Sequence, residues 1–145
     1  MAGTKTLTII KPGAVANEYI GPILSIIHDH GFHIAAMKML MLTRPMAEQF
    51  YYMHKGKPFY ENLINFMTSG PVVVAILEKE NAVEEYRKLI GDTDPAKAAP
   101  GTIRKMFAES ITKNAVHGSD SDESAERECD FFFSKIERFS KYETY

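Results

Sequence analysis

The sequence contains only one cysteine, Cys129, among its 145 residues. A single cysteine cannot form an internal disulfide, and it cannot build a structural zinc site without several histidine partners. We expect Cys129 to be a small apolar residue buried on a helix. The sequence also lacks the ~18 consecutive apolar residues of a membrane span and the apolar core of a secretion signal. These absences predict a soluble, cytoplasmic protein without membrane contact.

A strong excess of charge is missing as well. The formal net charge is −2 at pH 7, and the 17 Lys and Arg residues are spread along the chain. They create no basic field broad enough for a nucleic-acid duplex, so we expect no nucleic-acid partner. Hydrophobic residues make up 45% of the chain, which is enough for one core at this length. Residues 1–145 are therefore predicted to form a single domain.

Glycine-rich phosphate loops are absent too. The chain has no Gly-x-x-x-x-Gly-Lys segment and none of the protein-kinase motifs, so a glycine cradle cannot hold a phosphate here. The acidic segment 120–123 resembles the start of a calcium loop, but the glycine of its sixth position and the glutamate of its twelfth are missing. A calcium site is excluded on this ground.

The apolar pattern predicts four strands and five helices. A strand is favoured where β-branched or alternating apolar residues lie between turn residues, and a helix where apolar residues recur three or four positions apart. The expected strands are residues 4–11, 32–42, 71–78 and 115–117. The expected helices are residues 20–30, 45–55, 58–67, 82–90 and one that begins at Asp120 or Ser121.

This order of elements predicts an α+β fold. It is the ferredoxin-like βαββαβ arrangement, in which helices pack on one face of a four-stranded antiparallel sheet. Lys11-Pro12-Gly13 is expected to be a turn, which places Lys11 at a strand end. Asn81 is expected to cap the following helix. Residues 91–113 are too long for an ordinary connection and are predicted to be a functional loop.

His117 lies in the most informative segment, residues 114–121. Turn-forming, hydroxyl and carboxylate residues surround it, and a neutral imidazole can attack a phosphorus atom without a separate base. The alternative is a core histidine that a backbone group satisfies. Gly118 is expected to leave room for a phosphoryl group beside the ring, and Glu128 to hold one ring nitrogen. The remaining histidines have no metal-site spacing and are expected to be surface or packing residues: His28, His30, His33 and His54.

Cations and hydroxyl or amide donors that could hold a polyphosphate are spread over the chain. Together with His117 they suggest phosphoryl transfer. Three of them have an alternative: Lys11 beside a turn can serve solubility, Arg87 on a polar helix face can form an exposed ion pair, and Tyr51 can be a packed aromatic. The donors are Lys11, Tyr51, Arg87, Thr93, Arg104 and Asn114.

Six short segments, taken in order, carry a family resemblance. They are Thr8-Ile-Ile-Lys11-Pro12; Phe50-Tyr51 with Pro58-Phe59; Ser69-Gly-Pro-Val-Val73; Arg87 with Gly91-Asp-Thr93-Asp-Pro95; Pro100-Gly-Thr-Ile-Arg104; and the His117 segment, closing with Glu128. The chain resembles the nucleoside diphosphate kinases from Thr6 to the aromatic cluster near Phe133. The resemblance implies the same ferredoxin-like fold.

The resemblance also implies roles at the phosphate end of a nucleotide. His117 would become a pros-phosphohistidine, with Glu128 as its support. Lys11, Arg87, Thr93 and Arg104 would bind phosphates, because planar guanidinium groups suit the charge that spreads over the phosphoryl oxygens. Tyr51 would orient the histidine or donate to the phosphate. Asn114 would contact the ribose 3′ hydroxyl or the bridging oxygen, Ser119 would support Glu128, and Asp120 would be structural.

At the base end, the resemblance assigns Phe59, Leu63 and Ile111 to a clamp. From the residues alone, these three look like core positions. Stacking on an aromatic ring is indifferent to the identity of the base, which agrees with the low base specificity of the family. Gly13 departs from the family, which usually has aspartate after Lys-Pro. Its loss removes a carboxylate from that turn, and we expect catalysis to survive.

The implied reaction is a ping-pong transfer of the γ-phosphate from a nucleoside triphosphate, such as ATP or GTP, to a nucleoside diphosphate. Mg²⁺ would arrive with the nucleotide and would need no dedicated protein cage. Members of the family are homo-oligomers, tetramers or hexamers built from dimers.

Two alternative functions compete with this one. A non-catalytic nucleotide-binding or scaffolding protein would have lost part of the residue set. A histidine phosphorelay module would need no nucleotide clamp.

Overall fold

The computed structural model describes residues 3–143, which fold around a four-stranded antiparallel sheet with the strand order β2-β3-β1-β4. The element order is the βαββαβ arrangement that the sequence predicts. The strands are β1 Lys5–Ile10, β2 His33–Leu40, β3 Val72–Glu78 and β4 Val116–Gly118.

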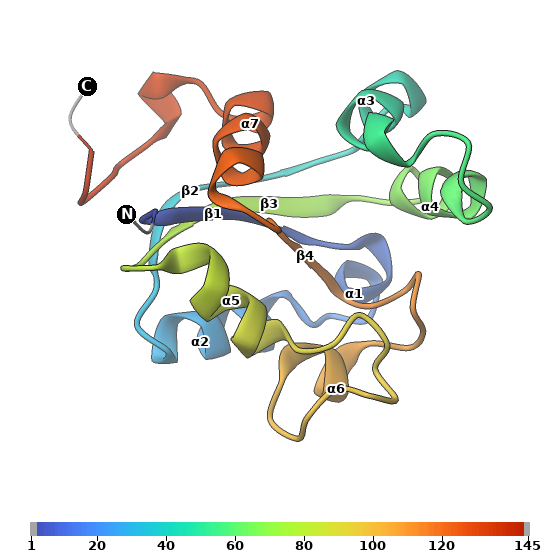
Figure 1. The fold of residues 1–145 in the computed structure, drawn as a ribbon, viewed down its shortest axis with the longest axis horizontal. Coiled ribbons are helices and arrows are strands. Elements are labelled where there is room, and N and C mark those ends of the chain that lie inside the picture. The colour runs from blue at the N-terminus through green and yellow to red at the C-terminus, as the bar shows by residue number, and fades with distance from the viewer. Residues whose placement is uncertain (1–2, 144–145) are drawn as a thin grey trace.

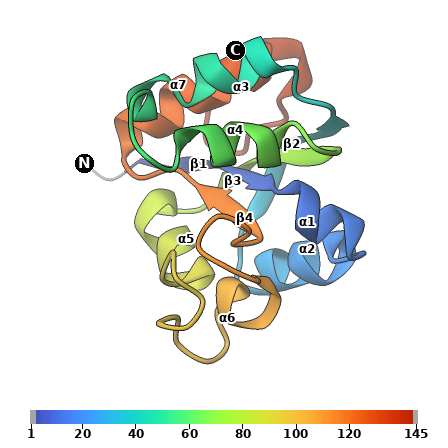
Figure 2. The same ribbon diagram turned by 90° about the vertical axis from the view of Figure 1, so that its right-hand side faces the viewer.

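Helices cover both faces of the sheet, as the two perpendicular views show (Figures 1 and 2). The prediction of helices on one face only is therefore wrong. On one side lie α3 Arg44–Phe50, α4 Tyr60–Met67 and α7 Asp122–Phe132. On the other side lie α1 Pro12–Ala16, α2 Ile20–Asp29, α5 Ala82–Ile90 and α6 Ile103–Phe107. Within residues 3–143, no helix is both long enough and apolar enough to cross a bilayer.

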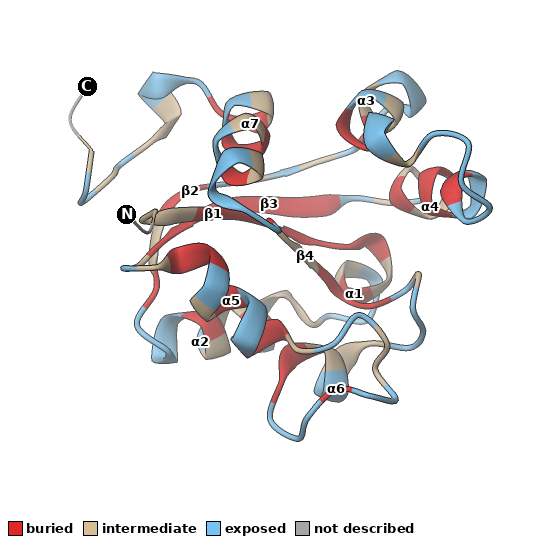
Figure 3. Cartoon of the chain, in the orientation of Figure 1, coloured by how far each residue is buried: buried red, intermediate tan, exposed pale blue. Residues whose placement is uncertain are grey.

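The burial of β3 explains the two helical layers. All seven residues of the strand are buried, so the strand is red throughout in Figure 3. Val74 and its neighbours two positions away face the core beneath α3, α4 and α7, whereas Val73 and Ala75 face the core beneath α2 and α5. Side chains alternate along a strand, and a strand that is apolar at every position needs cover on both sides. Cys129 is fully buried on α7, as predicted.

Three local predictions need correction. Pro12 begins the short helix α1 instead of a turn, because proline is tolerated in the first turn of a helix. The helix expected at 45–55 ends at Phe50 and continues as the 3-10 turn η1, Tyr52–His54. Asn81 has a left-handed backbone, φ 56°, and its side chain donates to the Glu84 carboxylate instead of capping α5.

The pairing of β1 with β4 brings the predicted reactive residues together. His117 is in register with Ile9, and Lys11 N donates to Ala115 O at 2.8 Å, directly before β4. Ala115 has φ 75°, and Val116 N donates across it to Asn114 O at 2.9 Å, which closes a γ-turn that is rare for a residue with a Cβ. The strained turn centred on Ala115 therefore lies directly before β4, and a backbone hydrogen bond joins it to the residue after β1.

Gly118 allows α5 to approach β4 closely. A Cβ at this position would lie 3.0 Å from Ile90 Cδ1 and 3.1 Å from Tyr86 Cδ2. Tyr86 is fully buried, and its hydroxyl is 2.6 Å from Thr8 Oγ1. The close packing of α5 on β4 therefore requires glycine at position 118, and the predicted role of Gly118, which was to leave room for a phosphoryl group, stays a prediction.

We predict that Gly118→Ala lowers the free energy of unfolding by about 1–3 kcal/mol, because the methyl group must displace two well-packed side chains. Gly21→Ala is the matched control. It lies on α2, no atom lies within 4 Å of the position that its new methyl group would take, and alanine favours a helix. Urea unfolding of both variants tests this. Equal stability of Gly118→Ala and the native chain would contradict the packing argument.

Candidate functional site

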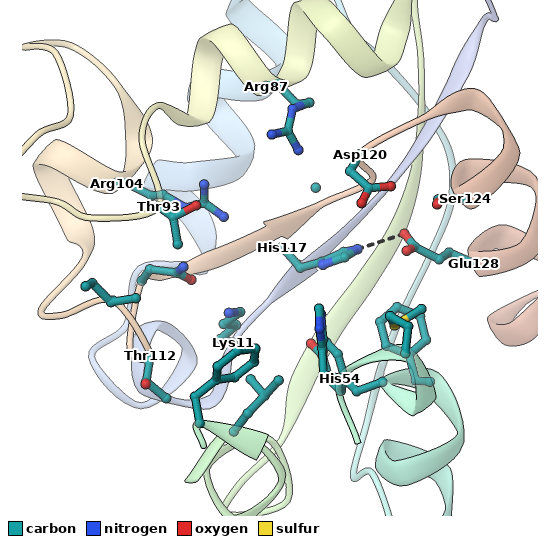
Figure 4. Close-up of a pocket in the computed structure, with 18 residues that line it drawn as sticks. Lys11, His54, Arg87, Thr93, Arg104, Thr112, His117, Asp120, Ser124 and Glu128 are labelled. Atoms are coloured by element: carbon teal, nitrogen blue, oxygen red, sulfur yellow. Dashed lines mark hydrogen bonds and ion pairs between the residues drawn. The ribbon is translucent and has the colours of Figure 1, made fainter. Parts of the chain in front are cut away.

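A cavity of about 440 Å³ opens beside His117, at the ends of β1 and β4 (Figure 4). α3 and the turn that follows it, α4, α5, α7 and residues 91–114 also contribute to its wall. The structure brings together thirteen of the predicted site residues there: Lys11, Tyr51, Phe59, Leu63, Arg87, Thr93, Arg104, Ile111, Asn114, His117, Gly118, Asp120 and Glu128. Ser119 is fully buried behind the wall.

The His117 ring is held by a short chain of hydrogen bonds. Its Nε2 lies 2.7 Å from Glu128 Oε1, and Ser119 Oγ donates to the same oxygen at 2.7 Å. Leu7 N of β1 in turn donates to Ser119 Oγ at 3.1 Å. A carboxylate that binds Nε2 favours the proton on that nitrogen, so the neutral ring has its lone pair on Nδ1. Nδ1 has no hydrogen-bond partner within residues 3–143.

Two aromatic residues of the α3 end contact the same ring. Phe50 meets it edge-on, with 5.4 Å between ring centroids, and Tyr51 does so at 6.5 Å. The Tyr51 hydroxyl is buried without a partner in the described chain. Burial raises the pKa of Tyr51, and the nearby charge of Glu128 raises it further. The hydroxyl therefore stays protonated and can donate a hydrogen bond to a ligand.

Lys11 is an almost fully buried cation, with 6% of its surface exposed. Its Nζ atom has no hydrogen-bond or salt-bridge partner among the described residues, and the side chain lines the cavity. Burial lowers the pKa of Lys11 to about 7, and the positive charge of Arg104 contributes to the shift. A buried amine without an anion is stabilised by any ligand that brings negative charge.

Arg104 fixes the long loop to the sheet. Its Nη1 donates to Gly91 O and its Nη2 to Val116 O, each at 3.0 Å, while Nε is buried and unpaired. Burial is the main cause that lowers the pKa of Arg104 to about 10. With this pKa, the guanidinium is still charged at neutral pH. Gly91 has φ 87°, and a Cβ there would lie 2.6 Å from Thr102 Oγ1. The loop reaches Arg104 only with glycine at that position.

Arg87 is exposed on α5 and turns toward the cavity (Figure 4). The neighbouring Lys88 pairs with Glu84 at 3.7 Å and with Glu85 at 3.4 Å. Arg87 forms no salt bridge within residues 3–143, so the exposed ion-pair interpretation is wrong for this residue and applies to Lys88. Figure 4 shows the Arg87 and Arg104 side chains on the same side of the His117 ring.

Asp120, expected to be structural, is an exposed residue that lines the cavity. A hydrogen bond from Ser124 lowers the pKa of its carboxyl group, and the charges of Arg87 and His117 act in the same direction. Ser121, one of the two expected caps, accepts from Ser124 N at 3.0 Å and begins α7. Asp120 is therefore an ionised carboxylate at the rim and is not the helix cap.

Apolar side chains form the other end of the cavity. Phe59 is 44% exposed and Ile111 58% exposed, although both are large and apolar, whereas Leu63 is buried between them and the core. Asn114 Oδ1 is buried and unpaired on the loop between the two ends. The cavity thus has a polar, cationic end at His117 and an apolar end at Phe59.

Five residues of the wall received no site role from the sequence: Phe50, Met53, His54, Thr112 and Ser124. His54 was expected to be a surface or packing residue, and its position in the wall of the cavity was not predicted. A signal was available, because His54 follows Tyr51 by three residues, which is one turn of a helix. Thr112 and Ser124 had no such signal, since their positions depend on how the long loop and α7 reach β4.

Comparison with known proteins identifies the family. A family model described as nucleoside diphosphate kinase matches residues 4–138. The chain belongs to the nucleoside diphosphate kinase family. Proteins of this family transfer a phosphoryl group from a nucleoside triphosphate to a nucleoside diphosphate, and the chain is a phosphotransferase of that class.

Curated relatives and solved structures agree with this assignment. Nucleoside diphosphate kinase 1 of Protochlamydia amoebophila is 56% identical over 94% of this chain and 97% of its own. The enzyme of Flavobacterium psychrophilum is 54% identical over 96% of this chain and 100% of its own. The Aquifex aeolicus kinase structure has a TM-score of 0.91 and 45% identity, over 93% of this chain and 98% of its own. A Halobacterium salinarum kinase, solved in complex with CDP, has a TM-score of 0.90 and 33% identity, over 97% of this chain and 93% of its own.

Gly13 lies on α1 against the ring of Phe66. A Cβ at Gly13 would be 3.4 Å from Phe66 Cζ, and Lys113 Nζ lies 6.0 Å from the centroid of the same ring. The kinase therefore has an aromatic ring, covered by a cation, beside the position where the family usually has aspartate. A Cβ at Gly13 would make ordinary van der Waals contact with that ring.

The buried Lys11 generates a stability prediction. Its folded-state pKa of about 7 lies below the ordinary 10.5, so between these values the unfolded chain binds more protons and native stability rises with pH. We expect Lys11→Met to remove this rise. The free energy of unfolding of the native chain, relative to the variant, should increase by a few kcal/mol from about pH 7 to about pH 10.

Urea unfolding at several pH values measures this difference. Lys88→Met is the matched control, because it removes an exposed lysine whose partners are Glu84 and Glu85. If the difference between the native chain and Lys11→Met does not change with pH, Lys11 is charged in the folded protein over the whole range and the burial argument is wrong.

Proposed function

We propose that His117 Nδ1 accepts the terminal phosphoryl group of a nucleoside triphosphate and returns it to a nucleoside diphosphate in the same cavity. One observation supports this above all. The contact between His117 Nε2 and Glu128, itself held by Ser119, commits one ring nitrogen and leaves the other without a partner in a cationic cavity. Such a ring is already oriented for attack and need not be deprotonated first.

The chemical step follows from that orientation. The Nδ1 lone pair forms a bond to the γ-phosphorus as the bond from that phosphorus to the bridging oxygen breaks, and the diphosphate leaves with the bonding electrons. The ring acquires positive charge while its Nε2 proton remains hydrogen-bonded to Glu128 Oε1. A buried carboxylate stabilises that charge more than a solvated one would, because the local dielectric is low. The second half-reaction is the reverse, with a new diphosphate as acceptor.

The cations at the polar end supply electrostatic stabilisation. Lys11, Arg87 and Arg104 line the cavity on the side of His117, and Thr93 adds a hydroxyl there. In a loose phosphoryl-transfer transition state, charge spreads over the equatorial and leaving oxygens, where fixed donors act most strongly. We assign the three cations and Thr93 to the phosphates, and the Tyr51 hydroxyl and Asn114 to the reacting group and the ribose 3′ hydroxyl.

The apolar end would hold the base. Phe59 and Ile111 are exposed apolar side chains, and Leu63 forms the floor between them. A base that stacks on such a surface makes few hydrogen bonds through its edges, so purines and pyrimidines bind alike. The Halobacterium salinarum relative bound to CDP shows that a pyrimidine diphosphate occupies a kinase of this fold. We therefore propose low base specificity for this chain.

Mg²⁺ would enter with the nucleotide. No group of three or more His, Cys, Asp or Glu residues that could hold a metal ion occurs within residues 3–143. Of the two cavity carboxylates, Glu128 already binds His117 and Ser119, and Asp120 is exposed at the rim. Asp120 is thus the carboxylate that could contact such an ion through water. When bound, Mg²⁺ would neutralise phosphate charge.

Other parts of the proposal go beyond the family assignment. An assembly of identical chains, a tetramer or hexamer built from dimers, remains a prediction, as do the cytoplasmic location and a single domain over residues 1–145. Exposed methionines on the edge strand β2 and its end leave an apolar edge that a second chain could cover: Met37, Met39 and Met41.

Phosphorylation of the protein tests the nucleophile. After mixing with γ-labelled ATP and Mg²⁺, the native chain should carry an acid-labile, base-stable label. His117→Ala should carry only background label, whereas His28→Ala, which removes an exposed histidine of α2, should label as the native chain does. Equal labelling of the native chain and His117→Ala would refute the proposed mechanism.

The supporting carboxylate gives a graded prediction. Glu128→Gln keeps the side-chain size but loses the charge that faces Nε2, so the rate of labelling should fall by about 10- to 100-fold. Stopped-flow or quench measurement of a single turnover gives this rate. Glu126→Gln, an exposed change on the same helix, serves as the control and should be neutral for the rate. An unchanged rate for Glu128→Gln would show that the charge of this carboxylate does not contribute to the transfer.

A further inference from the structure

Arg127 lies on α7 directly before Glu128, and it does not line the cavity. Its guanidinium carbon lies 5.8 Å from the centroid of the Phe50 ring and 5.5 Å from that of the Tyr52 ring. Phe50 is the last residue of α3, and Tyr52 begins the turn η1. A guanidinium that packs over aromatic faces is attracted to them and loses freedom to move. The Arg127 side chain therefore joins α7 to the end of α3.

One nitrogen of this guanidinium is directed at the carboxylate that holds His117. Arg127 Nη2 is buried, has no hydrogen-bond partner within residues 3–143, and forms an ion pair with Glu128 Oε2 at 3.6 Å. Neighbouring residues of a helix do not normally face each other, so the helix alone does not produce this contact. The guanidinium must turn back along α7 to make it. The rings of Phe50 and Tyr52 hold it in that direction.

The two oxygens of Glu128 have different partners. Oε1 is 2.7 Å from His117 Nε2 and accepts from Ser119 Oγ at 2.7 Å, and Figure 4 shows the carboxylate reaching the ring from α7. Among the described residues, Oε2 has only the cation of Arg127. The Glu128 side chain is 6% exposed, so water does little to satisfy or screen its charge. A cation at one oxygen and two donors at the other fix the plane of the carboxylate.

We propose that Arg127 is a positioning residue for phosphoryl transfer: it holds Glu128 Oε2 so that Oε1 keeps facing His117 Nε2. The proposal rests on the function proposed above, in which His117 Nδ1 is the nucleophile. Without the guanidinium, Oε2 has no partner among the described residues, and the carboxylate can turn about its side-chain bonds. The ring then loses the fixed acceptor that keeps its proton on Nε2. The alternative role is packing alone, in which Arg127 only covers Phe50 and Tyr52.

Single-turnover labelling of the full chain with γ-labelled ATP and Mg²⁺ tests the proposal. Arg127→Met keeps a long, unbranched side chain against the two rings but removes the charge, and the rate of labelling should fall roughly fivefold. Arg127→Leu takes its place if that variant does not fold. Arg127→Lys restores a cation and should recover most of the rate. Arg44→Met, which removes a guanidinium paired with Glu48 and Glu61, is the matched control and should label at the native rate.

Two further measurements separate positioning from packing. Affinity for ADP, measured by calorimetry, should stay native in Arg127→Met, because Arg127 does not line the cavity. In ¹⁵N spectra of the neutral His117 ring, the native chain should carry the proton on Nε2, whereas Arg127→Met should show a mixture of both tautomers. Packing alone would leave the tautomer unchanged. The spectra need no nucleotide, so they report on the ring whether or not transfer occurs.

A double-mutant cycle identifies the residue through which Arg127 acts. In a Glu128→Gln background, Arg127→Met should cause no further loss of rate, because the carboxylate that it positions is gone. A second fivefold loss there would show that Arg127 acts by another route, and the proposal would be wrong. A native rate or a single Nε2 tautomer in Arg127→Met, a loss of its ADP affinity, or no recovery in Arg127→Lys would overturn it as well. Failure of the His117 mechanism would appear separately, as labelling of His117→Ala.

Discussion

The contact between His117 and Glu128 is the interaction on which the site depends. Glu128 is 5% exposed, and a buried carboxylate needs partners for its charge. Ser119 Oγ and His117 Nε2 supply them on a single oxygen, and Ser119 in turn accepts from the β1 backbone. The orientation of one imidazole is thus fixed by β1, β4 and α7 together. Without this contact, the ring could rotate about its side-chain bonds, and Nδ1 would no longer face the cations for most of the time.

A second constraint is the desolvation of the polar end. Lys11 has no anion, and the Tyr51 hydroxyl, Arg104 Nε and Asn114 Oδ1 are buried without partners in the described chain. Each such group costs stability in the empty protein, and a ligand with many acceptor oxygens removes that cost on binding. The sequence has no glycine-rich phosphate loop, so in the proposed site side chains, and not backbone amides, would bind the phosphates. The buried core around β1 and β3 contributes stability that offsets the cost of these unpaired groups.

Much of this could be predicted from the sequence, and the errors have physical causes. The strands follow from runs such as residues 71–78, whose apolar residues have no alternation, yet that same run should have shown that both faces of the sheet need cover. The chemistry of the side chains and the family resemblance of the short motifs grouped His117, Arg104 and Lys11 in one predicted site, and the cavity brings the three together. The packing role of Gly118 was not predicted, since its Cβ direction depends on how α5 crosses β4. His54 was missed for a similar reason: only the turn after α3 brings its ring back into the cavity.

The division of the cavity into two ends bears on how one site can serve many nucleotides. At the His117 end, the groups are cationic: Arg104 is fixed by hydrogen bonds to the backbone of Gly91 and Val116, Lys11 is buried, and Arg87 is exposed. At the other end, Phe59 and Ile111 expose apolar surface, and polar groups near Phe59 are the His54 ring, at 5.2 Å, and Lys57 Nζ, at 5.9 Å from the ring centroid. Discrimination between bases requires buried polar groups that the wrong base leaves unpaired. Among the described residues, Tyr51 and Arg104 carry such groups near His117, where the proposal places the phosphates that all nucleotides share. If the phosphates and the base lie as proposed, such a site would bind the phosphate chain closely and discriminate little between bases, which is what a reaction between different nucleotides requires.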